Sequence, residues 1–369
     1  MIQKWCKSCL LSNTRPNIYI MGDGECNACK NHRNNKNNNR AHGKKKLLKL
    51  FSQIKRKKKA GYDCLVPVSG GKDSTWQVLT CLNNGLKVLA VTYKSPGRNS
   101  LGSQNLKNLV SLGVDHIDFT LNPKVEKYFM LKTFKKKGST AIPMHFSIYN
   151  LPYKFAELFG IPLIVWGENP AEEYGYLNKN DLNLKGGRWW QKHGALSNTS
   201  ISSWKDKVIN KKNLFPLTLN SKIRVKSIFL SDFIEWDPVK IKKIVKKKGF
   251  KFSENVKTGI YNFADIDCDF ISIHHYLKWY KFGLTRAFDN LSIEIRNKRV
   301  SRKKAISMLK MSLKKIRPKD DIKKFCKFVG ISIREFNLIC EKFRNKKIWE
   351  KRGKNWKIKN FLIKNFIWQ

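Results

Sequence analysis

Six residues at 69–74, Ser-Gly-Gly-Lys-Asp-Ser, combine the groups that bind phosphate in proteins. They follow an apolar run, CLVPV at 64–68, and precede a segment with helical periodicity. The first turn of a helix has unpaired N–H groups and carries about half a positive charge, so it attracts anions. Glycine lets the backbone approach a ligand closely, the two serines add hydroxyl donors, and Lys72 adds a cation. The hexapeptide predicts a polyphosphate site at a strand-to-helix turn, with an ordinary glycine turn as the alternative.

The hexapeptide is not a Walker A loop. That pattern ends in Gly-Lys followed by Ser or Thr, whose hydroxyl holds Mg²⁺. Here Asp73 follows Lys72. Because carboxylate oxygens are good ligands for a hard cation that bridges phosphates, Asp73 is the candidate Mg²⁺ ligand.

Four of the nine cysteines have the spacing of a metal site. Cys6 and Cys9 form one C-x2-C pair, Cys26 and Cys29 form a second, and sixteen residues separate the pairs. Two such pairs can close a tetrahedral four-sulfur shell around Zn²⁺, and four protein ligands make the predicted role structural. A redox pair or an iron–sulfur cluster is the alternative.

Short apolar runs alternate with helical segments after residue 61. The expected strands lie at 64–68, 87–93, 114–120 and 161–167, with helices that include 73–84 and 102–112 between them. This alternation is typical of a parallel sheet with helices on both faces, whose ligands bind at the carboxyl ends of the strands. The predicted fold class is therefore a doubly wound parallel α/β sheet.

The chain divides into four expected parts. Residues 1–32 predict a zinc knuckle, and residues 33–60 a polar linker followed by a basic amphipathic helix. Residues 61–235 predict the phosphate-binding α/β domain, and residues 236–369 a mainly helical C-terminal region.

The composition indicates a folded protein without a membrane-spanning segment. The chain has 369 residues, of which 41% are hydrophobic, so it can build a folded core. Its longest apolar runs fall well short of the roughly 20 residues that span a membrane, and no apolar signal segment follows the N-terminal charges. We therefore expect a cytoplasmic protein without a membrane span.

The net charge of +48 is the extreme feature of the composition. Such a charge can attract nucleic acid or a polyanionic small substrate. However, the lysines are spread along the whole chain together with many Asn and Ile, as an AT-rich coding bias produces. We expect no nucleic-acid partner.

The SGGKDS hexapeptide after an apolar strand resembles the PP-loop of the ATP pyrophosphatase superfamily (HUP/PP-loop type). This resemblance implies that ATP is cleaved between its α and β phosphates. Further blocks resemble the N-acetyl sugar amidotransferases of the WbpG/PseA type from surface-polysaccharide biosynthesis. They extend from near Cys6 to about residue 345, and the most specific are WGENPAEEYG at 166–175 and HHYLKWYKFG at 274–283.

The family resemblance implies a reaction. The acetamido group of a nucleotide-activated sugar becomes an acetamidino group, in the synthesis of lipopolysaccharide O-antigen or of pseudaminic-type sugars. The amide oxygen takes AMP from ATP, pyrophosphate leaves, and ammonia then displaces AMP. In the family, ammonia comes from a HisH-like glutaminase that works with a HisF-like cyclase homologue. Because no cysteine of this chain lies in a glutaminase nucleophile motif, we expect both proteins as partners.

Site roles carry over to the positions that match the family. ATP binding falls to Ser69, Gly70, Gly71, Lys72, Asp73 and Ser74, and catalysis to Lys72, Asp73, Glu168 and Glu173. Sugar binding falls to Asn169, Glu172, Tyr174, Lys281 and Arg286. Surface charge is the alternative for the glutamates, and a packed aromatic helix with exposed lysines is the alternative for the segment that contains Lys281.

Two other functions stay open at this point. A tRNA-modifying PP-loop enzyme of the thiolase or lysidine type also combines zinc knuckles with this loop and a basic surface. Sulfur transfer, however, needs reactive or cluster-binding cysteines beyond the zinc set, and the other five cysteines here stand singly. A nucleotide-binding scaffold without catalysis is the second alternative, and the intact Lys72 and Asp73 count against it.

Overall fold

A five-stranded parallel sheet forms the centre of the protein in the computed structural model, which describes residues 3–37, 40–56, 61–167, 196–210, 212–219 and 225–368. The strands are β1 (Cys64–Pro67), β2 (Val88–Tyr93), β3 (Asp115–Phe119), β4 (Leu163–Trp166) and β5 (Lys226–Phe229). They are ordered β3-β2-β1-β4-β5, and every neighbouring pair is parallel. The first four agree with the expected runs, whereas β5 is an edge strand that the apolar pattern did not predict.

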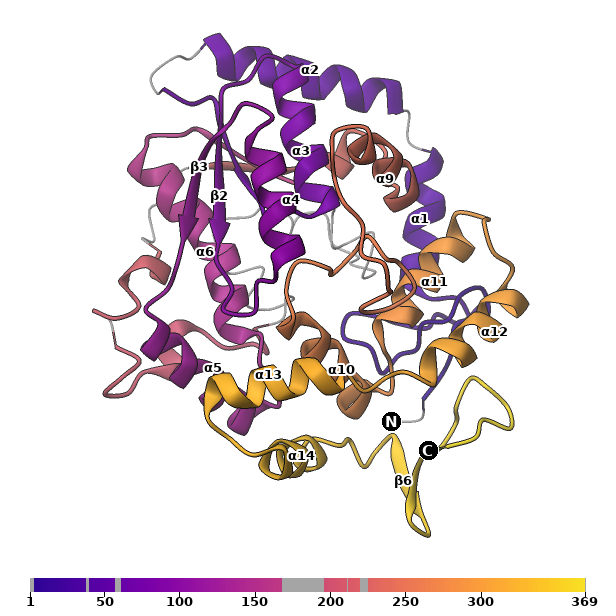
Figure 1. The fold of residues 1–369 in the computed structure, drawn as a ribbon. Coiled ribbons are helices and arrows are strands. Elements are labelled where there is room, and N and C mark those ends of the chain that lie inside the picture. Colours follow the sequence, from indigo (N-terminus) through magenta and orange to yellow (C-terminus); the bar gives the residue numbers. More distant parts are fainter. Residues whose placement is uncertain are drawn as a thin grey trace.

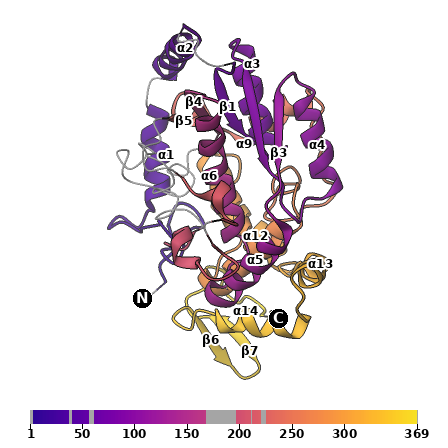
Figure 2. The ribbon, with the colours of Figure 1, turned by 90° about the vertical axis from the view of Figure 1, so that its left-hand side faces the viewer.

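Helices cover both faces of the sheet (Figures 1 and 2). One face carries α2 (Arg40–Arg56), α3 (Lys72–Asn83), α4 (Ser100–Val110) and α9 (Pro238–Lys246). The other carries α5 (Pro123–Lys137) and α6 (Ile142–Leu158). In β1, Cys64 and Val66 belong to the first core and Leu65 to the second. Strands buried on both faces read as continuous apolar runs, which is why the runs were visible in the sequence.

The strand order reverses at β1. From β1 the chain proceeds outward to β2 and β3, and it then crosses back through α5 and α6 to place β4 on the other side of β1. A crevice forms at such a switch point beyond the carboxyl ends of the strands. Residues 69–74 leave β1 at this point. The predicted fold class, a doubly wound parallel α/β sheet, is confirmed.

The C-terminal region is mainly helical, as predicted. It contains α10 (Phe270–Phe282), α11 (Arg286–Arg296), α12 (Arg302–Leu313), α13 (Lys319–Val329) and α14 (Ile333–Lys342). Ser301 and Ser332 cap α12 and α14 by accepting backbone N–H bonds, and Gly283 and Gly330 end α10 and α13 in the left-handed conformation. An antiparallel hairpin of β6 (Trp349–Arg352) and β7 (Asn355–Ile358) follows, at the end of the molecule opposite α2 (Figure 2).

Further short elements complete the described chain. They are α1 (Asn27–Asn37) and the 3-10 helices η2 (Ile201–Trp204), η3 (Phe215–Leu217) and η4 (Leu230–Asp232). None of the helices in the described ranges combines the length and the apolar character that crossing a bilayer takes.

Glu126 on α5 is a buried carboxyl, 2% exposed, whose Oε1 has no hydrogen-bond partner among the described residues. Burial raises the pKa of Glu126 to about 8. Between the pKa of an unfolded glutamate and pH 8, Glu126 therefore binds more protons in the folded state than in the unfolded state, and its contribution to the free energy of unfolding falls as pH rises. At pH 7, Glu126→Gln is expected to be more stable by about 3 kcal/mol.

Denaturant unfolding between pH 5 and pH 8 measures this effect. The difference in the free energy of unfolding between Glu126→Gln and the unmodified protein should grow as pH rises, because the glutamine does not titrate. Glu157→Gln, at an exposed position of α6, is the matched control, and its difference from the unmodified protein should not change with pH. Equal pH slopes for the unmodified protein and Glu126→Gln would contradict the burial argument.

Candidate functional site

The hexapeptide at 69–74 forms the predicted turn between a strand and a helix. β1 ends at Pro67 and α3 begins at Lys72 with Gly71 as its N-cap, so the first-turn N–H groups face the carboxyl end of the sheet. Gly70 has φ +83°, and a Cβ at this position would lie 2.7 Å from the backbone N of Leu106 on α4. Only glycine combines this backbone conformation with this close packing.

The two hydroxyls of the hexapeptide hold the turn together. Ser69 Oγ accepts from Gly71 N at 3.2 Å, and Ser74 Oγ donates to Gly71 O at 3.0 Å. Ser74 Oγ also accepts from Ser69 N at 3.4 Å. The loop is thus bonded into its shape by its own side chains, which reduces the ordering that a phosphate ligand has to impose.

Lys72 and Asp73 form a partly buried pair beside Trp236. The Nζ of Lys72, whose side chain is 5% exposed, forms an ion pair with Asp73 Oδ2 and lies 5.3 Å from the centre of the Trp236 ring. Trp236 Nε1 donates to Asp73 Oδ1 at 2.9 Å. Both oxygens of Asp73 are therefore engaged, and a Mg²⁺ ion at Asp73 has to compete with these donors. Trp236 lies in the segment SDFIEWDP at 231–238, and no local pattern in this segment predicts contact with a residue 163 positions earlier.

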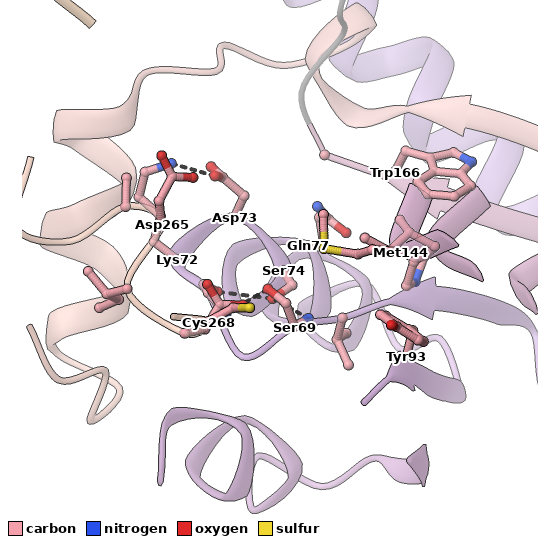
Figure 3. A pocket seen from close by; sticks show the side chains of 18 of the residues that line it. Ser69, Lys72, Asp73, Ser74, Gln77, Tyr93, Met144, Trp166, Asp265 and Cys268 are labelled. Carbon is pink, nitrogen blue, oxygen red and sulfur yellow. Dashed lines mark hydrogen bonds and ion pairs between the residues drawn. The ribbon is translucent and has the colours of Figure 1, made fainter. Parts of the chain in front are cut away.

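A cavity of about 430 Å³, here called the central pocket, opens above this turn. Its lining includes Ser69, Gly71, Lys72, Asp73 and Ser74 of the turn, His145 and Tyr149 of α6, and Asp265, Asp267, Cys268, Arg286 and Asn290 of the C-terminal region. Figure 3 shows Lys72, Asp73 and Asp265 on one side of the pocket and Tyr93, Met144 and Trp166 on the opposite side. The pocket therefore lies between the sheet and the C-terminal helices.

Asp265 is the strained residue of the pocket wall. Its φ is +56°, which is uncommon for a residue other than glycine and is frequently found at functional sites. Asp265 Oδ2 accepts from Thr258 Oγ1 at 2.7 Å and lies 3.3 Å from both His275 Nε2 and Arg286 Nε. Burial by itself raises the pKa of Asp265, but the charge of Arg286 and the His275 contact hold it well below its usual range. Asp265 is therefore a charged group that anchors Arg286.

The pKa of Asp267, two positions after Asp265, shifts in the opposite direction. Burial raises the pKa of Asp267 to about 6, although a hydrogen bond with Ser69 acts in the opposite direction. This carboxyl therefore connects the wall to the turn at 69–74, and it takes up a proton more readily than an ordinary aspartate. The alternating Asp residues at 265 and 267 place two carboxyls with different proton affinities on one pocket wall.

Three histidines lie next to this wall. The rings of His145 and His274 are 5.5 Å apart, and those of His274 and His275 are 5.4 Å apart. Burial lowers the pKa of His145 and of His275 to about 4, and it also lowers the pKa of His274. His145 Nδ1 lies 2.6 Å from Ala141 O, and because a carbonyl only accepts, Nδ1 carries the proton. At neutral pH these rings thus supply proton-accepting nitrogens and no positive charge.

Of the other predicted site residues, some belong to the central pocket or its support and others do not. Gly70 packs behind the pocket against α4, and Arg286 lines the pocket. Lys281 is not among the described lining residues; its Nζ lies 5.6 Å from the centre of the Phe282 ring, and burial lowers its pKa to about 8. Glu168, Asn169, Glu172, Glu173 and Tyr174 lie outside the described residues.

The four predicted metal ligands meet in one buried cluster. The Sγ atoms of Cys6, Cys9, Cys26 and Cys29 all lie within 4.8 Å of one another. The Cys6–Cys29 and Cys9–Cys26 Sγ distances are 4.0 Å and 3.6 Å, close to the ~3.8 Å edge of a tetrahedron with Zn–S bonds of about 2.3 Å. Backbone N–H groups of Cys9 and Cys26 point at Cys6 Sγ at 3.4 Å and 3.2 Å, which favours a thiolate there. This donor set fits Zn²⁺.

Replacing Gly70 with alanine is expected to destabilise the protein and to weaken ATP binding. The left-handed φ costs a residue with a Cβ about 1–2 kcal/mol, and overlap with the α4 backbone adds on the order of 1–3 kcal/mol. Denaturant unfolding and ATP titration measure the two effects. Gly85→Ala is the control, because its φ is +68° but the nearest atom to an added Cβ is Lys55 Nζ at 3.5 Å. Equal losses in the two variants would contradict the packing argument.

Three solved structures resemble the chain weakly. They are an NMN synthetase from Francisella tularensis (15% identity, 59% of this chain and 98% of that chain, TM-score 0.28), a predicted tRNA methyltransferase subunit from Methanocaldococcus jannaschii (13%, 63% and 91%, TM-score 0.29) and an NH3-dependent NAD synthetase from Campylobacter jejuni (16%, 59% and 99%, TM-score 0.30). At these TM-scores none of them carries an argument about the fold or activity of this chain. A comparison with curated protein sequences gives no match.

One family model matches, and it covers residues 251–362. Its description is "LPS biosynthesis protein WbpG-like, C-terminal domain". The matched range contains most of the pocket residues that the C-terminal region contributes, among them Asp265, Asp267, Cys268, Arg286 and Asn290. The resemblance noted in the sequence is thereby confirmed: residues 251–362 are similar to the C-terminal domain of WbpG-like proteins.

Proposed function

We propose that this protein is an ATP-dependent, AMP-forming amidotransferase that converts an acetamido group of a nucleotide-activated sugar to an acetamidino group. One observation carries the proposal. The phosphate-binding turn and the WbpG-like C-terminal domain line the same pocket, so ATP bound at the turn would meet a substrate held by the C-terminal domain. The substrate class comes from the family resemblance, and surface-polysaccharide synthesis is the proposed context.

The chemistry requires ATP because an amide oxygen is a very poor leaving group. The amide oxygen forms a bond to the α phosphorus of ATP, the bond from that phosphorus to the bridging oxygen breaks, and pyrophosphate leaves. Ammonia then forms a bond to the activated carbon, the carbon–oxygen bond breaks, and AMP leaves. The nitrogen gives up a proton in this second step, and the acetamidino group is the product.

The residues of the turn are suited to the first step. The N–H groups of the first turn of α3 and the cation of Lys72 stabilise the negative charge that develops on pyrophosphate. Mg²⁺, with Asp73 as its proposed ligand, would supply further positive charge to the phosphates. Arg286 and Lys281 are the proposed contacts of the anionic part of the sugar substrate.

The second step needs a proton acceptor and a source of ammonia. Glu168 and Glu173 are the proposed acceptors, with Asn169, Glu172 and Tyr174 as proposed sugar contacts. A HisH-like glutaminase with a HisF-like cyclase homologue is the proposed source of ammonia. Zn²⁺ in the four-cysteine cluster has a proposed structural role.

Mass spectrometry of the products tests this function. The protein is incubated with ATP and ammonium, and with either a UDP-diacetamido sugar or unmodified tRNA. We expect AMP and a sugar whose mass shows replacement of one oxygen by an imino group. Modification of the tRNA alone would favour the tRNA-modifying alternative, and formation of ADP in place of AMP would contradict the reaction.

A further inference from the structure

The N-terminal segment that carries the four cysteines, residues 3–34 and here called the cysteine module, packs directly on α11 and α12 (Figure 1). Leu10 is fully buried in one core with Phe288 of α11, and the Trp5 ring stacks on the Phe288 ring with centroids 5.7 Å apart. Arg302 of α12 donates to the carbonyl oxygens of Cys9 and Cys6 at 3.2 Å and 3.3 Å. The module therefore shares its core with the helix that begins at Arg286.

A chain of charged groups runs from this module to the pocket. Arg15 Nε lies 2.7 Å from Asp289 Oδ1, and Asp289 Oδ2 lies 3.7 Å from Arg286 Nη1. Arg286 Nε in turn lies 3.3 Å from Asp265 Oδ2 on the pocket wall. The four side chains are between 10% and 19% exposed, so solvent screens these interactions only partly.

Arg286 thus lies between two carboxylates that compete for it. Burial by itself raises the pKa of Asp289, but Arg15, Lys278 and Arg286 lower it well below its usual range, so Asp289 is charged. Arg15 Nε lies 2.7 Å from an oxygen of Asp289, whereas Arg286 Nη1 lies 3.7 Å from the other oxygen. If Arg15 loses its charge, Asp289 attracts Arg286 more strongly, and the guanidinium is drawn away from Asp265.

We propose that Arg15 is a positioning residue for the central pocket: by pairing with Asp289 it keeps the guanidinium of Arg286 on Asp265, where Arg286 meets the anionic part of the substrate. Arg15 itself does not line the pocket. The inference rests on the proposed function for the identity of the substrate, but the contact it describes exists without substrate. It makes the cysteine module part of the substrate-binding machinery and not only a stabilising element.

Three variants test the proposal. Arg15→Met removes the charge with little change in length, and Arg15→Lys restores a charge. Arg33→Met is the matched control, because Arg33 lies in the same module and pairs with Glu25 at 2.8 Å, but its side chain is 56% exposed and the pair does not reach α11. Metal content and thermal midpoint are measured for each variant, so that a variant that fails to fold is recognised.

The kinetic expectation is a selective loss. Arg15→Met should raise the KM for the nucleotide sugar at least about tenfold, with the KM for ATP and the metal content unchanged. Arg15→Lys should recover most of the loss, and Arg33→Met should resemble the unmodified protein. An unchanged sugar KM in Arg15→Met, or an equal rise in Arg33→Met, would overturn the inference.

A second readout separates this inference from the proposed function. The ¹⁵N NMR signal of the Arg286 Nε–H group, identified by its loss in Arg286→Lys, reports the contact with Asp265 without any substrate. It should shift in Arg15→Met and stay in place in Arg33→Met. If the protein does not act on a nucleotide sugar but this signal shifts as expected, the proposed function fails and the positioning role stands. An unshifted signal in Arg15→Met overturns the positioning role in either case.

Discussion

Lys72→Met is expected to lower the rate of AMP and pyrophosphate formation by on the order of 10²–10³-fold, the usual effect of removing one group that stabilises charge developing in a transition state. Among the described residues that line the central pocket, Lys72 and Arg286 are the only lysine or arginine side chains. Lys72 is also the one that lies in the first turn of α3, where phosphate is expected. Pyrophosphate release, coupled to a colour reaction and checked by chromatography for AMP, measures the rate.

The control for this experiment is Lys87→Met. Lys87 is exposed, and its Nζ lies over the Tyr62 ring at 5.3 Å, away from the described pocket lining. This variant should retain the unmodified rate, and both variants should keep the unmodified thermal midpoint to within a few degrees. A Lys72→Met protein that forms AMP at the original rate would remove Lys72 from the catalytic assignment.

Cys26→Ala is expected to abolish stoichiometric zinc binding and to unfold the cysteine module. Structural Zn²⁺ contributes roughly 10–16 kcal/mol to the folding of small zinc modules at neutral pH, so a site with three of its four thiolates loses much of this free energy. Because Trp5 and Leu10 pack on α11, loosening of the module should also expose part of the α11 core. Elemental analysis for zinc and limited proteolysis within residues 3–34 measure the two effects.

Cys340→Ala is the matched control, since both thiols are fully buried. Cys340 belongs to the core around α10, α13 and α14, with no second described cysteine cluster near it. Its replacement should cost on the order of 1 kcal/mol through lost packing and leave zinc content unchanged. A protein with Cys26→Ala that still binds one zinc ion per chain would show that the four-sulfur shell is not the metal site.

The sequence was most informative where the signal is local. The residues from 64 to 74 predict strand, turn and helix in order, because apolar runs, glycine and helical periodicity act over only a few residues. The spacing of the two cysteine pairs predicts the cluster for the same reason, since two residues between thiolates already suit one metal ion. β5 was missed because its partly exposed edge position, next to residues outside the described ranges, lacks the continuous apolar pattern of the central strands.

The properties of the pocket wall could be predicted from the sequence only in part. The aspartates at 265 and 267 were visible as an alternating pair, but their different pKa shifts follow from neighbours that other segments supply, Arg286 and His275 in one case and Ser69 in the other. The sequence predicts both Lys281 and Arg286 as sugar contacts, yet α10 ends between them. Only Arg286, at the start of the next helix, lines the described pocket.

By itself, therefore, the sequence determined the strand-to-helix turn at 69–74, the four-cysteine cluster, the α/β class and the WbpG-like character of residues 251–362. The tertiary structure alone decided that Trp236 contacts Asp73, that the C-terminal domain closes the pocket above the turn, and that Arg15 reaches Arg286 through Asp289. The physical reason is the same in each case. These contacts join residues separated by 163 and 274 positions along the chain, and their energies depend on burial and on the direction of side chains, which no local pattern of residue types encodes.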